Sequence, residues 1–120
     1  MKWWTTLRHC VYCGVCLVPG HVEPHGRDTA TRDHLFPKSR NGKDTVDACA
    51  YCNEKKADRD LLGWMTSRSL ADRRQAVKRL PGTQEPMKLS SLQTRYIAAR
   101  RVARARERHL DGTMEANPRF

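Results

Sequence analysis

The cysteines are the residues whose spacing points most directly to chemistry. Four of the five stand in two Cys-x-x-Cys pairs, CVYC at residues 10–13 and CAYC at residues 49–52. Two residues between thiolates allow one tight turn to present both sulfurs to a single ion, and two such turns complete a tetrahedron. We therefore predict a closed, structural zinc site, which contributes to folding rather than to catalysis. Its ligands would be Cys10, Cys13, Cys49 and Cys52.

Two other ligand sets are open to the same segment. Cys16 could pair with the cysteine three residues before it, but Gly14 favours the CVYC pair, because a glycine after the second sulfur permits a positive φ there. His21 and His25 could complete a Cys2His2 site with that first pair. The prolines and glycines around these histidines argue against a helix that would carry them as ligands.

The composition predicts a small, strongly basic protein. The 120 residues hold 23 Lys and Arg against 13 Asp and Glu, a formal net charge of +10, and only 38% are hydrophobic. Such an excess of positive charge favours a polyanion partner, most often nucleic acid. The sequence shows no secretory signal and no run near the roughly 18 apolar residues of a membrane span. We expect a cytoplasmic protein with no membrane partner, whose thiols bind metal rather than form disulfides.

The segment between the cysteine pairs predicts strand, loop, strand and helix in that order. Residues 28–36, DTATRDHLF, are short with alternating threonines and favour a strand, whereas residues 37–44, PKSRNGKD, have the composition of a turn. Residues 48–65 contain few helix breakers and predict a helix. The fold class is therefore α+β.

Two more helices are predicted in the second half of the chain. Residues 61–80 show helical spacing, with Ser67 or Ser69 as a start and Pro81-Gly82 as the end, and residues 88–110 begin near Ser90 or Ser91. We divide the chain into a core at 1–62, a basic helical extension at 63–112 and a frayed tail at 113–120. The apolar positions of the two helices are Leu70, Val77 and Leu80, then Leu92, Tyr96, Ala99 and Ala103.

Asp33 and His34 lie between the cysteine pairs at the end of the predicted strand. The segment that contains them resembles the HNH endonucleases of the ββα-metal (His-Me finger) type, in the subgroup with two Cys-x-x-Cys pairs. The resemblance rests on the Asp-His pair, a proline three residues after the histidine, a serine two residues beyond it, a glycine turn, and Cys-x-x-Cys-Asn-x-x-Lys in register. It covers residues 10–60 and implies a ββα core held by zinc, with the remaining residues as an extension.

The resemblance also implies a role for each motif residue. His34 would be the general base that takes a proton from water, since histidine is largely neutral near pH 7. Asp33 and Asn53 would bind one catalytic Mg²⁺ or Mn²⁺, because hard cations prefer oxygen ligands. Lys56 would contact phosphate. For Asp33 and His34 to converge on one phosphate, the backbone must bend, so we predict irregular backbone at residues 33–37.

One residue departs from the pattern. The family's middle asparagine, which braces the loop between the strands, is Asp44 here. An ionised carboxylate accepts hydrogen bonds but cannot donate them. The predicted function is a metal-dependent endonuclease that hydrolyses double-stranded DNA without a small-molecule cofactor and leaves 5′-phosphate and 3′-hydroxyl ends. The alternative is a non-catalytic, zinc-stapled DNA-binding module whose loop Asp44 has altered.

Basic residues supply the expected DNA contacts. Residues 95–108, RYIAARRVARARER, contain six arginines and one glutamate, which suits phosphate contacts along a helix. The alternative is a solvated helix face that packs its apolar stripe on the core. Besides Lys56, the predicted DNA-binding side chains are Lys38, Arg40, Arg95, Arg100, Arg101 and Arg104.

Overall fold

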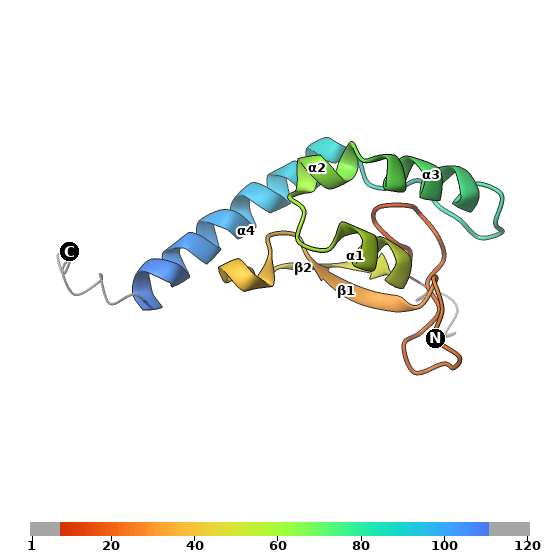
Figure 1. Cartoon of the computed structure of the whole chain (residues 1–120), viewed down its shortest axis with the longest axis horizontal. Helices are drawn as coiled ribbons and strands as arrows, with labels where there is room; N and C mark the ends of the chain where they lie inside the picture. Colours follow the sequence, from red (N-terminus) through yellow and green to blue (C-terminus); the bar gives the residue numbers. More distant parts are fainter. Residues whose placement is uncertain (1–7, 111–120) are drawn as a thin grey trace, which may run out of the picture.

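A two-stranded hairpin and the helix that follows it form the centre of the molecule. The computed structural model describes residues 8–110. Strands β1 (Ala30–His34) and β2 (Thr45–Cys49) pair antiparallel, from Ala30 opposite Cys49 to His34 opposite Thr45. Helix α1 (Ala50–Lys56) follows β2 directly and lies across the hairpin (Figure 1). This arrangement confirms the α+β class and the predicted order of strand, loop, strand and helix.

The loop between the strands is a short 3-10 helix, η2 (Lys38–Arg40). It ends at Asn41, whose φ of 69° lies in the left-handed region that asparagine tolerates better than most residues. Gly42 follows, where an added Cβ would lie 1.9 Å from the carbonyl oxygen of Phe36. The sequence Asn-Gly therefore turns the chain back toward β2, as the composition predicted.

The predicted helix over residues 48–65 is wrong as a single element. Its first two residues belong to β2, and α1 ends at Lys56 because Ala57 has a φ of 47°. Asp60 then starts a new helix, α2 (Leu61–Met65), by accepting a hydrogen bond from the Gly63 N–H at 2.8 Å. An aspartate at the N-cap favours the start of a separate helix at this point.

Helix α3 (Arg68–Val77) begins where the sequence predicted it. The hydroxyl of Ser67 accepts a hydrogen bond from the Leu70 N–H at 3.2 Å, which makes Ser67 the N-cap. Leu70 and Val77 are buried, as predicted, but Leu80 is 40% exposed because the helix ends three residues before it. The buried apolar pattern of this helix therefore ends at Val77, and the inclusion of Leu80 in it was wrong.

Helix α4 (Leu89–Leu110) is the longest element, and it runs beside η2 and α2 with its last turns beyond the rest of the molecule (Figure 1). It begins before Ser90, so neither predicted serine is its N-cap. The predicted apolar stripe is confirmed: Tyr96 is half-buried and its ring meets Phe36 edge-on, with centroids 5.6 Å apart. The other stripe residues, Leu92, Ala99 and Ala103, are buried.

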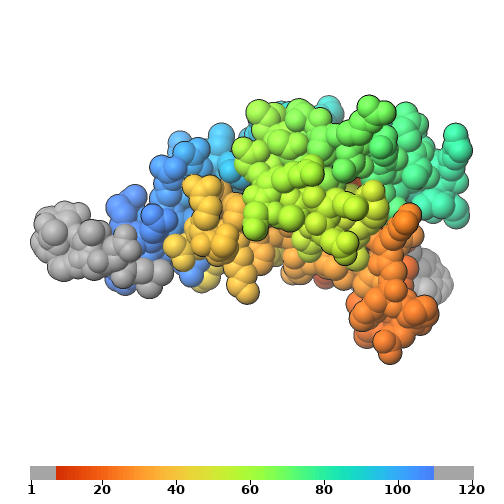
Figure 2. All heavy atoms as spheres, viewed as in Figure 1, coloured from red at the N-terminus to blue at the C-terminus, as the bar shows by residue number. Residues whose placement is uncertain are grey.

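The main hydrophobic core joins both halves of the chain. It contains residues from Cys10 to Leu92, including buried side chains of β2 and of α1 to α4. The predicted boundary at residue 62 stays a prediction, and the predicted tail at 113–120 lies outside the described residues. Within residues 8–110 no helix is both long and apolar enough to cross a membrane. A loop near residues 20–28 projects from one end of the molecule (Figure 2).

Candidate active site and metal centre

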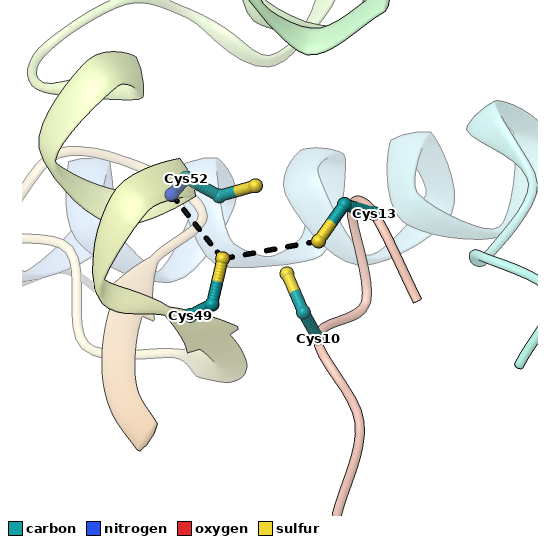
Figure 3. A group of neighbouring side chains, drawn as sticks. All are labelled: Cys10, Cys13, Cys49 and Cys52. Atoms are coloured by element: carbon teal, nitrogen blue, oxygen red, sulfur yellow. Dashed lines mark hydrogen bonds between the residues drawn. The ribbon is translucent and has the colours of Figure 1, made fainter. Parts of the chain in front are cut away.

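Four sulfurs from two distant segments converge at the start of α1 (Figure 3). The Sγ atoms of Cys10, Cys13, Cys49 and Cys52 all lie within 4.8 Å of one another, and all four residues are buried. Around a tetrahedral zinc with bonds of about 2.3 Å, sulfurs stand roughly 3.8 Å apart. The Cys13 and Cys49 sulfurs are 3.8 Å apart already. The predicted ligand set is confirmed as a cluster able to hold a metal such as zinc.

Backbone geometry prepares both turns of the cluster. In the first turn, the Gly14 N–H donates to the Cys10 carbonyl at 2.9 Å, and Gly14 adopts a φ of 85°. An alanine there would place its Cβ 2.0 Å from the Gln84 carbonyl oxygen. In the second turn, Cys49 is the N-cap of α1, and its sulfur accepts the Cys52 N–H at 3.4 Å. The positive φ predicted for Gly14 is confirmed.

Hydrogen bonds among the buried thiols separate their pKa values. A hydrogen bond with Cys10 lowers the pKa of both Cys49 and Cys13. A hydrogen bond with Cys13 raises the pKa of Cys10, and one with Cys10 raises that of Cys52. The four sulfurs alone therefore favour shared protons over four negative charges, whereas a bound divalent cation would compensate the thiolates.

An arginine from α3 supports the same cluster. Arg73 donates to the Cys49 sulfur at 3.6 Å and pairs with Asp28 at 2.6 Å. Burial opposes the charge of Arg73, but the bond to Asp28 and the charge of Cys49 raise its pKa. This guanidinium offsets negative charge on the sulfurs from outside the predicted ligand set. Cys16 is partly buried and stands outside the cluster, and His21 and His25 are exposed.

Asp33 lies on the face of β1 that α1 covers, and it is only 4% exposed. Its Oδ2 accepts a hydrogen bond from the Tyr12 hydroxyl at 2.5 Å and lies 3.2 Å from the Lys56 ammonium nitrogen. Lys56 also donates to the His34 carbonyl at 3.1 Å, and it is 1% exposed. The phosphate contact expected of Lys56 is therefore corrected: a side chain buried on Asp33 neutralises that carboxylate and is not at the surface.

Asn53 lies one helical turn before Lys56, also against β1. Its amide nitrogen donates to the Thr31 hydroxyl at 3.0 Å and to the Arg32 carbonyl at 3.3 Å. Thr31 and Asp33 are two residues apart and so share a face of the strand. Both bonds use the amide nitrogen, so neither occupies the amide oxygen of Asn53. The helix that Cys52 anchors therefore brings Asn53 and Asp33 to one interface.

His34 occupies the last position of β1 and is partly exposed. The pairing with Thr45 is regular there, and the chain bends only at residues 35–36. The predicted irregularity is thus wrong for residues 33 and 34, because the ladder continues to the Leu35 N–H, which donates to the Asp44 carbonyl at 3.1 Å. By strand alternation, the His34 ring lies on the face opposite Asp33.

Comparison with known proteins gives a family match to part of the chain. A family model described as HNH endonuclease matches residues 13–59, the segment that holds the hairpin, α1 and three of the four cysteines. Residues 13–59, which make up less than half of the chain, therefore match the HNH endonuclease domain. No curated protein and no solved structure gives a significant match to the chain. The family match ends before α2, so it describes neither the remaining helices nor their role.

Asp44, which stands where the HNH pattern has its middle asparagine, forms an ion pair with a residue of α4. The Asp44 carboxylate accepts a charged hydrogen bond from Arg95 at 2.8 Å, and Arg95 also donates to the Thr45 carbonyl at 3.4 Å. Arg106, further along α4, donates to the Asn41 carbonyl at 2.7 Å. An aspartate side chain cannot donate hydrogen bonds. Here the arginines of α4 donate hydrogen bonds to the loop between the two strands.

The other basic residues differ in their surroundings. Lys38 and Arg40 are exposed on η2, with the Arg40 guanidinium 4.8 Å from the Phe36 ring centroid. Arg95 is engaged with the loop, as described. Helical periodicity puts Arg95 and Arg106 on one side of the apolar stripe. The exposed arginines on the other side and outer face are Arg100, Arg101 and Arg104.

Tyr12 and Thr31 are the residues of this interface that the sequence did not single out. Tyr12 sits inside the first cysteine pair, and Thr31 sits two residues before Asp33. The one signal for Tyr12 is a hydroxyl-bearing ring between two cysteines predicted to be buried, since a buried tyrosine needs a polar partner. Which partner it finds depends on how the turn lies over β1.

Proposed function

We propose that the chain is a metal-dependent DNA endonuclease that hydrolyses phosphodiester bonds at the hairpin–α1 interface. The observation that carries the proposal is the docking of Asn53 on β1 beside Asp33, within a segment that matches the HNH family. The cysteine cluster fixes the start of α1 and therefore the direction in which Asn53 projects. The structural zinc would in this way support the chemistry without taking part in it.

The oxygen donors at this interface suit a hard divalent cation. Asp33 offers Oδ1, since both bonds described above go to its Oδ2, and Asn53 offers its amide oxygen. Mg²⁺ or Mn²⁺ would supply positive charge to the phosphate and to the leaving oxygen. The partners of these residues hold the two oxygens in place. We expect 5′-phosphate and 3′-hydroxyl products.

His34 would act as the general base from the last position of β1. Because Asp33 faces the other side of the strand, the His34 ring would have to reach the phosphate around the strand end. No hydrogen bond engages its imidazole among residues 8–110, so the ring is available to accept a proton from water. Lys56 holds the His34 carbonyl and so fixes the end of β1 that carries the ring. Double-stranded DNA would approach over the exposed Lys38 and Arg40, which neighbour this strand end in the loop.

A plasmid assay tests the proposal. We expect cleavage with Mg²⁺ or Mn²⁺, none with EDTA, and at least a 100-fold slower rate for His34→Ala, because a general base contributes about 10²–10⁴ in rate. His25→Ala is the matched control, since His25 lies in the exposed loop at residues 20–28. Equal cleavage by wild type and His34→Ala contradicts the assignment of the base.

A non-catalytic DNA-binding module is the second candidate, and one observation favours it. Lys56 places an ammonium against Asp33, where a cation would otherwise supply the positive charge. Under this alternative, the chain binds duplex DNA without cutting it under any divalent cation. Gel-shift measurements beside the plasmid assay separate the two functions, since only the nuclease converts supercoiled DNA to nicked or linear forms.

A further inference from the structure

We propose that Tyr12 is a positioning residue that orients Asp33 for the catalytic cation, which rests on the proposed function. The Tyr12 hydroxyl donates to Asp33 Oδ2 at 2.5 Å, and Tyr12 is fully buried. Tyr12 lies between Cys10 and Cys13 in the first turn of the sulfur cluster. One side chain thus connects the structural metal centre to the candidate catalytic carboxylate.

The position of the Tyr12 ring is fixed from several sides. It meets the buried Trp64 ring edge-on, with centroids 5.9 Å apart and planes at 87°. The Tyr12 carbonyl accepts the Arg74 Nε–H at 2.7 Å, which ties the turn to α3. The Asp33 carboxylate therefore meets a donor that the surrounding packing holds in place.

This donor decides which oxygen Asp33 can offer. Tyr12 and Lys56 both engage Oδ2, so the carboxylate cannot rotate freely and Oδ1 is the oxygen left for the cation. Outer partners of metal ligands fix ligand orientation, and their loss typically costs about 10–100-fold in metal affinity or activity. Tyr12→Phe should therefore weaken the catalytic cation while leaving the zinc cluster intact.

The second cysteine pair contains a tyrosine, Tyr51, that serves as the matched control for Tyr12. Tyr51 holds the same place in CAYC that Tyr12 holds in CVYC. No hydrogen bond involves the Tyr51 hydroxyl within the described residues, and its ring lies 5.0 Å from the Arg73 guanidinium. Tyr51→Phe removes the same hydroxyl from the equivalent position, without touching Asp33.

The test is a Mn²⁺ titration of the full, zinc-loaded chain, read as the rise in melting temperature that binding causes. We expect Tyr12→Phe to bind Mn²⁺ at least tenfold more weakly than wild type, with unchanged zinc per chain, and Tyr51→Phe to match wild type. Wild-type Mn²⁺ affinity in Tyr12→Phe overturns the role of Tyr12. Asn53→Ala should lose the Mn²⁺-dependent rise in melting temperature. If Mn²⁺ does not raise the melting temperature of the wild-type chain either, the proposed cation site itself is refuted.

A second measurement needs no divalent cation and no cleavage. A double-mutant cycle compares Tyr12→Phe, Asp33→Asn and the double variant by their shifts of the urea midpoint. The two single shifts should not add up to that of the double variant, because each single change breaks the same hydrogen bond. If the midpoint shifts of the two single variants add up to that of the double variant, Tyr12 and Asp33 are not coupled. This readout also covers the case in which Tyr12→Phe folds too weakly for the titration.

Discussion

Replacing Lys56 with methionine should lower the free energy of unfolding by about 3–5 kcal/mol, the usual cost of leaving one member of a buried ion pair alone. The Lys56 ammonium nitrogen lies 3.2 Å from Asp33 Oδ2, and the two side chains are 1% and 5% exposed. Methionine fills a similar volume, so the cost comes from the uncompensated carboxylate rather than from a cavity. The loss is a large share of a typical stability of about 5–15 kcal/mol.

The pair formed by Arg95 and Asp44 supplies the matched control. Its atoms are closer, at 2.8 Å, but the two side chains are 43% and 38% exposed. Pairs at the surface contribute about 0–1 kcal/mol, so Arg95→Met should cost no more than that. Raising the salt from 0.1 to 1 M shortens the screening length from about 10 to about 3 Å. It should remove the effect of Arg95→Met and leave that of Lys56→Met.

Urea unfolding of the zinc-saturated chain, followed by circular dichroism, measures both costs. Lys56→Met should shift the midpoint at an unchanged slope. The double variant Lys56→Met/Asp33→Asn should recover part of the loss, because a neutral amide needs no counter-charge. A cost for Lys56→Met below about 1 kcal/mol, or equal to that of Arg95→Met, refutes the reasoning that burial makes this pair essential.

Three further outcomes concern zinc and DNA. Removing zinc with a chelator should lower the melting temperature sharply, since ion binding at the four sulfurs is part of the folding free energy; unchanged melting would contradict the metal centre. Gly14→Ala should weaken zinc retention in a competition assay, because its Cβ would meet the Gln84 carbonyl at 2.0 Å and its φ is 85°. Replacing Arg100, Arg101 and Arg104 by glutamine should reduce the slope of log affinity for duplex DNA against log salt by about 2.7, at about 0.9 per phosphate contact. An unchanged slope would show that these exposed arginines do not contact phosphate.

The four-cysteine cluster and the ββα order could be predicted from the sequence because both depend on local chemistry. The spacing within each Cys-x-x-Cys pair, the glycine behind the first pair and the Asn-Gly turn each act over a few residues. The prediction of one continuous helix over residues 48–65 was wrong because it, too, relied on local sequence alone. A scan for breakers finds none between Ala48 and Asp60, whereas the break at Ala57 accompanies a new helix capped by Asp60. Local propensity did not locate that boundary.

The sequence by itself predicted the cysteine cluster, the hairpin and the resemblance to the HNH family, since these follow from residue types at fixed short spacings. Only the tertiary structure decided the partners of the charged and polar side chains. Lys56, an expected phosphate contact, is buried as the counter-ion of Asp33, and Arg95 forms an ion pair with Asp44 that the sequence did not predict. The DNA contact predicted for Arg95 stays a prediction. The physical reason is that burial and long-range contacts set the cost of a charge, and a linear pattern contains neither.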